Sequence, residues 1–287
     1  MSAPTGPPPA LIREVVSRAL AEDVGPGDVT TQALFATRIP AIGTIIVEET
    51  GGLVLAGLAV AVEVFAQVDP SLTCSPSFTD GNRVSAGATV LTVTGDGRLM
   101  LKGERVALNF LQQLSGIATL TAKFCEAVKD FKTKIVDTRK TTPGLRVLEK
   151  WAVALGGGTN HRQGLADGIL IKDNHLALAS GDVARACRLA RERAPHGLKI
   201  EAEVQTLDEV RAALDGGADI ILLDNMDVPS VRKAVALIKG RALIEVSGGV
   251  ILANVREIAA AGPDLISVGA LTHSAPAVGL SMDIVAQ

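Results

Sequence analysis

The sequence predicts an α/β protein in which a parallel α/β barrel follows a smaller α+β portion. Two observations point to this fold class. Hydrophobic residues make up 47% of the 287 residues and aromatic residues only 2%, so the core is aliphatic, which suits a buried parallel sheet covered by helices. From residue 134 onward, short β-rich apolar runs alternate with helical stretches, which is the spacing of repeated βα units.

The first hundred residues mix helical and alternating hydrophobic patterns, separated by Gly- and Pro-rich turns. These patterns predict helices over residues 11–21 and 55–68 and strands over residues 39–49, 72–78 and 84–94. Residues 22–31 contain Gly25, Pro26 and Gly27 and are expected to form a loop. Such a mixture is typical of an α+β arrangement.

Residues 80–93 superficially resemble the hairpin of a biotinyl or lipoyl carrier domain. Those domains modify a lysine at the tip of the hairpin. The strand here runs on into Gly95-Asp96-Gly97 without such a lysine, so the carrier interpretation is disfavoured.

A long helical region begins at Gly97 and is expected to be interrupted at Gly116, with a second helix over residues 118–128. Six apolar runs then predict parallel strands over residues 134–136, 168–171, 198–204, 220–223, 243–246 and 265–268. The helices expected between them cover residues 181–194, 207–216, 228–239 and 251–261. This series indicates a strand-deficient parallel α/β barrel. A doubly wound sheet is disfavoured, because no G-x-G-x-x-G fingerprint follows a first strand.

The composition excludes several classes of protein. The formal net charge is −3, so no global basic field would attract nucleic acid. Cys74, Cys125 and Cys187 form no C-x-x-C pair, which argues against a disulfide framework or a thiolate zinc site. The longest apolar run, residues 53–62, is about half of what a membrane span needs. Residues 1–9 lack the segments of a signal peptide and predict a disordered leader. We therefore expect a soluble, cytoplasmic protein that binds neither nucleic acid nor membranes.

Polar or Gly-rich sequence follows every predicted barrel strand. The active face of a βα barrel lies at the C-terminal ends of its strands. In strand order these ends carry Arg139-Lys140, Lys172 to His175, Glu203, Asp224-Asn225, Ser247-Gly248-Gly249 and Gly269 to His273, and residues 156–162 precede the second strand. Six such ends on one face indicate a single site.

Two groups of ionisable residues stand at these strand ends. One group can carry positive charge and suits a small substrate with two or more carboxylates. It comprises Arg139, His161, Arg162 and Lys172. The other group, Glu203 and Asp224, suits a hydrated Mg²⁺ or the hydroxyls of a sugar.

The last two strand ends offer main-chain N–H groups at helix N-termini. Ser247-Gly248-Gly249 and Gly269-Ala270 therefore predict a phosphate cradle, which the last βα loops of this architecture commonly form. Together the strand ends predict a site for a polycarboxylate beside a phosphorylated sugar.

Each feature also has an interpretation without a ligand. Residues 137–146 could form a solvated basic turn. His161 and His175 could be turn residues satisfied by main-chain hydrogen bonds. Glu201 and Glu203 lie on the same side of one strand, because side chains alternate, and their position leaves the choice between them open.

The motifs resemble those of quinolinate phosphoribosyltransferase, also called nicotinate-nucleotide pyrophosphorylase (carboxylating). The matching stretches cover nearly the whole chain in family order: residues 22–25, 27–31, 103–109, 137–146, 156–162, 169–175, 201–204, 222–225, 247–249 and 268–274. The resemblance implies a type II phosphoribosyltransferase, a glycosyltransferase of the pentosyl-transferring kind. Such enzymes join quinolinate to 5-phosphoribosyl 1-pyrophosphate, release CO₂ and pyrophosphate, and give nicotinate mononucleotide for NAD biosynthesis.

The resemblance also implies a domain organisation. The family has an N-terminal α/β sandwich domain, expected here over residues 1–110, and a strand-deficient α/β barrel, expected over residues 111–287. A C-terminal tail is expected to pack back on the first domain. The family forms a homodimer in which each active site takes an arginine from the partner subunit.

The resemblance assigns roles to individual residues. The implied quinolinate-binding residues are Arg105, Arg139, His161, Arg162 and Lys172. The implied phosphoribosyl pyrophosphate-binding residues are Lys140, Glu203, Asp224, Ser247, Gly248, Gly249, Gly269 and His273. Lys140, Glu203 and Asp224 are the implied catalytic residues, and Glu203 and Asp224 the implied Mg²⁺ ligands, which favours Glu203 over Glu201. Arg105 would by default be solvated on its helix, but the match makes it the arginine shared across the dimer. Val246 departs from the family, which often has serine there.

Two rival functions remain. A related pyridine-carboxylate or pyrimidine phosphoribosyltransferase, or a family member attached to another pathway such as molybdenum transport, would share the phosphate loops and lose some of the carboxylate-binding cations. All of them are present here, which disfavours it. A non-catalytic phosphometabolite-binding barrel would bind ligand without releasing pyrophosphate.

Overall fold

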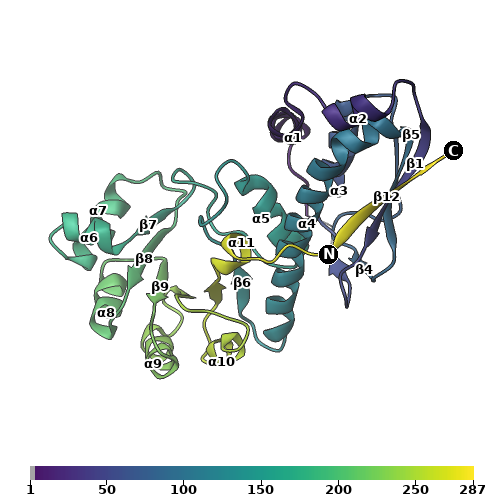
Figure 1. Ribbon diagram of the computed structural model, residues 1–287. Coiled ribbons are helices and arrows are strands. Elements are labelled where there is room, and N and C mark those ends of the chain that lie inside the picture. Colours follow the sequence, from purple (N-terminus) through teal and green to yellow (C-terminus); the bar gives the residue numbers. More distant parts are fainter. Residues whose placement is uncertain (1–3) are drawn as a thin grey trace. The chain divides into compact units, whose positions relative to one another are not determined.

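The computed structural model describes residues 4–287, which divide into two compact units (Figure 1). The first unit comprises the residues up to Ala122 together with Thr141–Gly157 and Leu271–Gln287. The second unit comprises Lys123–Lys140 and Gly158–Ala270. Residues 1–3 of the predicted leader lie outside the described part, and residues 4–8 have no regular secondary structure before the first helix begins at Pro9.

A four-stranded antiparallel sheet forms the centre of the first unit. Its strand order is β12 (Leu280–Ala286), β1 (Pro40–Val47), β5 (Thr89–Asp96) and β3 (Thr73–Pro76). A two-stranded ribbon pairs β2 (Leu53–Val54) with β4 (Arg83–Val84). Buried and less buried residues alternate along β1, so one face of the sheet contacts the core. The strands predicted at residues 39–49 and 72–78 are thus confirmed, whereas β12 was not predicted. The single strand predicted at residues 84–94 is partly wrong, because β4 ends at Val84 and β5 begins at Thr89 in a different sheet.

The helices of the first unit include two predicted ones. The predicted helices are α1 (Pro9–Val24) and α3 (Leu58–Val68). Two further helices were not predicted, α5 (Arg146–Leu155) and α11 (Ala270–His273). The expected loop over residues 22–31 is partly wrong, because α2 spans Val29–Leu34. Asp28 begins this helix by accepting the Thr31 N–H at 2.9 Å, as an N-cap does.

The helix α4 runs without a break from Gly97 to Ala127, so the predicted interruption at Gly116 is wrong. A Cβ at residue 116 would overlap the main-chain carbonyl oxygen of Pro276. The glycine therefore permits a close approach of the returning C-terminal segment, and it does not end the helix.

A six-stranded parallel sheet forms the centre of the second unit, in the order β6-β11-β10-β9-β8-β7. Its strands are β6 (Lys134–Val136), β7 (Ile169–Ile171), β8 (Ile200–Val204), β9 (Ile220–Asp224), β10 (Leu243–Ser247) and β11 (Leu265–Ser267). All six predicted strands are confirmed. The neighbouring helices α7 (Val183–Arg193), α8 (Leu207–Asp215), α9 (Val228–Ile238) and α10 (Val255–Ala260) match the prediction, and α6 (Asp173–Leu178) is additional. They lie outside the strands in chain order (Figure 1).

The register of the parallel strands places particular side chains in rows inside the sheet. Leu222 of β9 is level with Glu203 of β8 on one side and with Glu245 of β10 on the other. Two residues further along, Asp224 is level with Ser247. Because side chains alternate between the two faces, these polar residues share one face. The carboxyl ends of the strands therefore present acids and hydroxyls together.

Candidate active site

A cavity of about 430 Å³ opens at the carboxyl ends of the parallel strands of the second unit. Most of its lining side chains are polar or charged, which differs from the apolar interior beneath. The predicted site residues that line it are Arg139, Lys140, His161, Arg162, Lys172, Glu203, Asp224 and Ser247. The sheet thus brings residues from six separate segments into one cavity. The alternative that residues 137–146 are only a solvated basic turn does not account for this arrangement.

The segment after β6 is held by Asp137, which is fully buried. Its carboxylate accepts the main-chain N–H of His161 at 2.8 Å and the Asn160 side-chain amide at 2.7 Å. Thr159 pairs with β6 as well, since its N–H donates to Ile135 O at 2.8 Å. These bonds place residues 159–162 beside the end of β6, so that Arg139 and Arg162 reach the same cavity although they are distant in sequence.

Two arginines therefore share one cavity wall. Burial and the neighbouring Arg139 lower the pKa of Arg162, while Glu201 acts in the opposite direction. Arg162 Nη1 donates to the Gly168 carbonyl oxygen at 2.9 Å, and its buried Nε has no hydrogen-bond partner within the described chain. A guanidinium held in this way presents donors to an incoming carboxylate.

The acidic side of the cavity comes from β8 and β9. Glu203 Oε2 lies 3.2 Å from Lys172 Nζ, and the lysine is about half exposed. Asp224 Oδ2 accepts a hydrogen bond of 2.8 Å from Asn225, whose backbone has a left-handed φ of 53°. This short side chain tolerates that conformation and turns back onto its neighbour.

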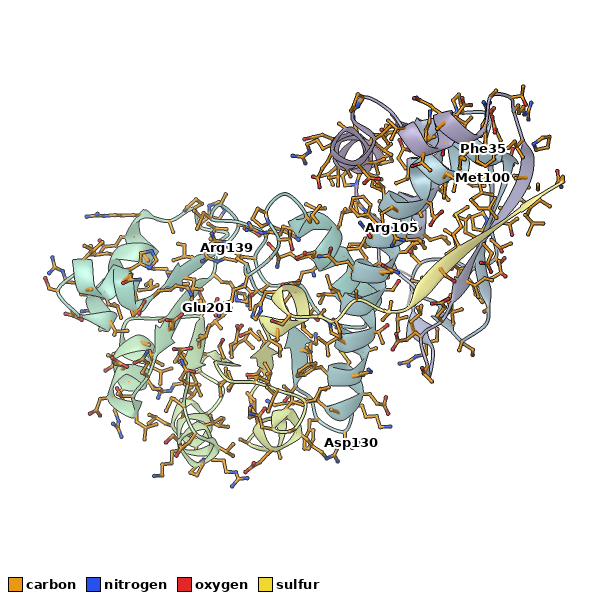
Figure 2. All side chains as sticks on the ribbon, in the orientation of Figure 1. Phe35, Met100, Arg105, Asp130, Arg139 and Glu201 are labelled. Carbon is orange, nitrogen blue, oxygen red and sulfur yellow. The ribbon has the colours of Figure 1, made fainter. Side chains whose placement is uncertain are left out.

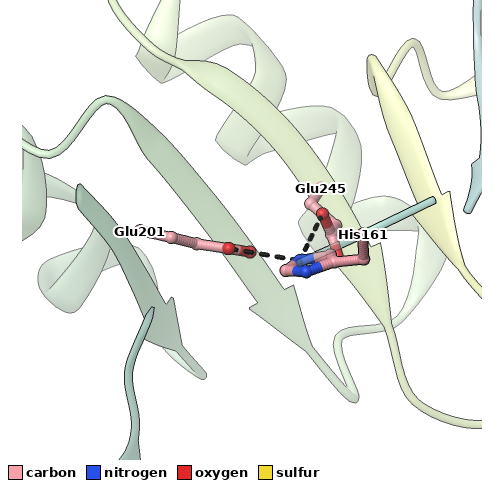
Figure 3. Close-up of side chains that lie close together, drawn as sticks. All are labelled: His161, Glu201 and Glu245. Carbon is pink, nitrogen blue, oxygen red and sulfur yellow. Dashed lines mark ion pairs between the residues drawn. The ribbon is translucent and has the colours of Figure 1, made fainter. Parts of the chain in front are cut away.

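His161 stands between two buried glutamates at the base of the cavity (Figure 3). Its Nε2 lies 3.2 Å from Glu201 Oε2 and 3.5 Å from Glu245 Oε2. Glu201 and Glu245 are 4% and 1% exposed, so water cannot screen them. Burial opposes a charge on the ring, whereas the two carboxylates favour a proton at the cluster. Burial and the charge of Glu245 also raise the pKa of Glu201, so the cluster as a whole retains protons.

A second cavity of about 310 Å³ reaches the same cluster from the other side. It is lined by Glu201, and His161 and Glu245 line both cavities. The open choice between the two glutamates of β8 now has a geometric basis. Glu203 lines the cavity with Lys172 and Asp224, whereas Glu201 lies deeper, against His161.

Several predicted residues do not line the cavity. Gly248, Gly249 and Gly269 follow β10 and β11 in the second unit. Arg105 and His273 belong to the first unit, where Arg105 is exposed on α4 (Figure 2). Their predicted roles stay predictions. His175, in contrast, accepts the Lys172 main-chain N–H at 3.0 Å, as its interpretation as a turn residue predicts.

The sequence interpretation missed Glu245 and the structural role of Asp137. A signal for Glu245 was present, since it is a lone acidic residue inside the apolar run Leu243 to Val246. A buried charge in such a run needs a partner. The partner, His161, is 84 positions away, and no sequence pattern identifies it.

The donor set of Glu203 and Asp224 fits Mg²⁺. Mg²⁺ is commonly held by one or two carboxylates together with substrate phosphates and water. These two carboxylates come from adjacent strands and line the same cavity as Lys140 and Ser247. The fit is one of ligand chemistry, because hard oxygen donors are what this ion prefers.

Comparisons with known proteins agree along the whole chain. The family model described as "Quinolinate phosphoribosyl transferase, N-terminal domain" matches residues 28–115, and the corresponding C-terminal domain matches residues 117–283. The chain is 40% identical over 273 residues to a probable nicotinate-nucleotide pyrophosphorylase [carboxylating] of Bacillus subtilis, covering 95% of this chain and 93% of that one. It is 43% identical over 282 residues to the probable enzyme of the same name of Synechocystis, covering 97% and 94%.

Solved structures show the same relationship. The crystal structure of NadC from Streptococcus pyogenes superposes with a TM-score of 0.93 at 42% identity, covering 99% of this chain and 100% of that one. A nicotinate-nucleotide pyrophosphorylase from Francisella tularensis superposes with a TM-score of 0.90 at 38% identity, covering 97% and 98%. With both family domains present in order and the two curated relatives matched over 93% and 94% of their length, this chain belongs to the quinolinate phosphoribosyltransferase family.

Proposed function

We propose that this chain transfers the phosphoribosyl group of 5-phosphoribosyl 1-pyrophosphate to quinolinate, with loss of CO₂, in NAD biosynthesis. The observation that carries the proposal is that one cavity is lined both by a group of cationic side chains and by a group of carboxylates. Arg139, Arg162 and Lys172 provide cations for a dicarboxylate, while Glu203 and Asp224 provide carboxylates for a metal and a ribose. The family relationship supports the same reaction.

The mechanism follows from placing the two substrates side by side. Arg139 and Arg162 hold the quinolinate carboxylates, and this orients the pyridine nitrogen toward the ribosyl carbon. Such orientation can supply an effective molarity of about 10⁵ M or more. Lys140 stabilises the charge of the departing pyrophosphate. When bound at Glu203 and Asp224, Mg²⁺ would neutralise part of the same charge.

Decarboxylation then needs no acid from the protein. Once the ring nitrogen bears the ribose it is cationic, and it can accept the electron pair that the departing carboxylate leaves on the adjacent carbon. The cationic wall positions this carboxylate until it leaves as CO₂. A proton from solvent water then binds to that carbon and completes the product, nicotinate mononucleotide.

The decisive assay measures CO₂ and pyrophosphate release from quinolinate, with nicotinate as the control substrate. The proposal expects both products from quinolinate and none from nicotinate. Arg139→Ala and Arg162→Ala should weaken quinolinate binding severely, whereas the exposed Arg232 of α9, replaced by Ala, should change nothing. Ligand binding without pyrophosphate release would support the non-catalytic barrel instead.

We further propose a homodimer in which Arg105 completes the partner's site. Arg105 is exposed on α4 and its contact with Glu104 is long, at 4.0 Å, so it is available to an anion. Mixing an Arg105→Ala chain with a Lys172→Ala chain should restore activity, because one site of the heterodimer then has both cations. No recovery after confirmed subunit exchange would refute this arrangement.

We also place the enzyme in the cytoplasm. Within residues 4–287, no helix combines the length and apolarity that a membrane crossing requires. Fractionation of cells that express the full chain tests this placement, and recovery in the membrane pellet would contradict it.

A further inference from the structure

Both ring nitrogens of His161 are engaged inside the protein. Nδ1 accepts the main-chain N–H of Arg162 at 2.8 Å. Nε2 faces the carboxylates of Glu201 and Glu245 at 3.2 and 3.5 Å, as Figure 3 shows. The ring can therefore hydrogen-bond a substrate only by giving up one of these contacts.

The contact at Nδ1 fixes the tautomer. A ring nitrogen that accepts an N–H has no proton of its own, so the proton of His161 sits on Nε2. The carboxylates favour a second proton on the ring, but at Nδ1 that proton would point at the Arg162 N–H. We therefore place any further proton of the cluster on a carboxyl group.

The same tautomer argues against a metal at this cluster. His161, Glu201 and Glu245 present one ligand atom each within 4.8 Å of one another, which is a spacing that suits a metal ion. A metal needs a lone pair on Nε2, and the proton there occupies it. The ring would have to break its bond to the Arg162 main chain and move its proton before a metal could bind.

We propose that Glu201 and Glu245 are positioning residues that act through His161 to fix Arg162 for the dicarboxylate. This inference rests on the proposed function, because it gives the cluster a role in quinolinate binding. The glutamates hold the ring by Nε2, the ring holds the Arg162 main chain by Nδ1, and Arg162 then directs its guanidinium into the cavity. His161 thus acts on the substrate through its neighbour.

The positions of the two glutamates explain why a pair is present. Glu201 comes from β8 and Glu245 from β10, so they approach the ring from either side of β9. Carboxylates on two different strands hold Nε2 from two directions, and together with the contact at Nδ1 they restrict the orientation of the ring. Asp137 fixes the other end of the residue by accepting the His161 main-chain N–H.

Two substitutions separate this role from direct substrate contact. In His161→Asn the side-chain oxygen can take the place of Nδ1 and accept the Arg162 N–H. In His161→Gln the side-chain amide can take the place of Nε2 and donate to the glutamates, but nothing replaces Nδ1. Each variant therefore keeps one of the two contacts and removes the other.

The experiment compares the KM values for quinolinate and for phosphoribosyl pyrophosphate in both variants. We expect His161→Asn, which keeps the contact with the Arg162 main chain but loses the glutamates that hold the side chain, to raise the KM for quinolinate about threefold. We expect His161→Gln to raise it about tenfold, the equivalent of one lost hydrogen bond, with the KM for phosphoribosyl pyrophosphate unchanged. Glu245→Gln, which keeps an acceptor, should resemble the wild type more closely than Glu245→Ala does.

The opposite order, with His161→Gln near wild type and His161→Asn impaired, would overturn the inference, and so would equal losses in both. Nitrogen NMR of the ¹⁵N-histidine-labelled protein gives a readout that does not depend on activity or on a folded variant. It should show one protonated and one unprotonated ring nitrogen for His161, and two protonated nitrogens would contradict the tautomer. If the wild type releases no CO₂ from quinolinate, the proposed function fails, and the NMR result still decides the tautomer.

Discussion

Replacing Gly248 by alanine tests how the strand-end glycines support the acidic side of the cavity. Gly248 has a φ of +91°, and a Cβ there would overlap Asn225 Oδ1 and lie 2.6 Å from Asn225 Cγ and 2.9 Å from its main-chain N. Ordinary contact begins at 3.4 Å, so both the side chain and the main chain of Asn225 must shift, the side chain by about 1 Å. This side chain donates the 2.8 Å hydrogen bond to Asp224, so the substitution reaches a predicted ribose and metal ligand without touching it.

The expected magnitude has two parts. A non-glycine residue at this φ costs roughly 1 to 3 kcal/mol of stability. Loss of the Asn225–Asp224 hydrogen bond costs about 1 kcal/mol more. A misplacement of about 1 Å in a site can cost up to about 100-fold in rate, so we expect the KM for phosphoribosyl pyrophosphate or the kcat to worsen at least tenfold.

Gly240, which lies between α9 and β10, provides a matched control. Its φ is +75°, and a Cβ there would meet nothing within 4 Å. Gly240→Ala should therefore carry only the backbone cost, roughly 1 to 2 kcal/mol, and leave Asn225 in place. Urea unfolding and steady-state kinetics on both variants measure the two parts separately. Equal kinetics for the two variants would refute the reasoning, because only Gly248 presses on Asn225.

Three further predictions concern stability. Thr206 and Glu209 form a capping box at the start of α8, so Thr206→Ala should cost about 1 kcal/mol in urea unfolding, and no change would show that the cap is dispensable. Ile221 is fully buried in β9, so Ile221→Val should lower the free energy of unfolding by about 1 kcal/mol, and a stabilised variant would contradict the close packing described. The Arg98 guanidinium hydrogen-bonds Asp96 and lowers the pKa of Asp96 from 3.8 to about 2. The ionised Asp96 therefore stabilises the folded protein above about pH 4, and this stabilisation is lost as the pH falls toward 2. In Asp96→Asn the thermal unfolding midpoint should depend less on pH between about pH 4 and pH 2. An unchanged pH dependence would assign the acid sensitivity to other groups.

The strands of the parallel sheet could be predicted because each is a short apolar run bounded by polar loops. The run Ile220 to Leu223 is an example, since three of its four side chains are buried or nearly so on both faces of the sheet. Element identity there is a local property of the sequence. The strand β12 could not be predicted in the same way, because it exists through pairing with β1, about 240 positions earlier.

Gly116 shows the opposite failure. A glycine within a helical pattern suggests a break in the helix. Here the helix continues, and the absence of a side chain at residue 116 lets the main chain of Pro276 pack closely against it. The site divides similarly. Arg139 and Asp224 could be predicted from their places at strand ends, whereas the pairing of His161 with Glu245 depends on tertiary structure. A local argument therefore finds the residues that line the cavity more readily than those that support them.

The buried pair Glu201 and Glu245 has a consequence for the empty protein. Arg139 and Arg162 repel each other, and in many anion sites only the ligand relieves such strain. Here the glutamate pair beneath the cations keeps part of its negative charge, and Glu201 favours the charge on Arg162 in the unliganded protein. For the dicarboxylate that we propose to bind here, less binding energy is then consumed in assembling the site, and more of it remains for holding the two reactants together.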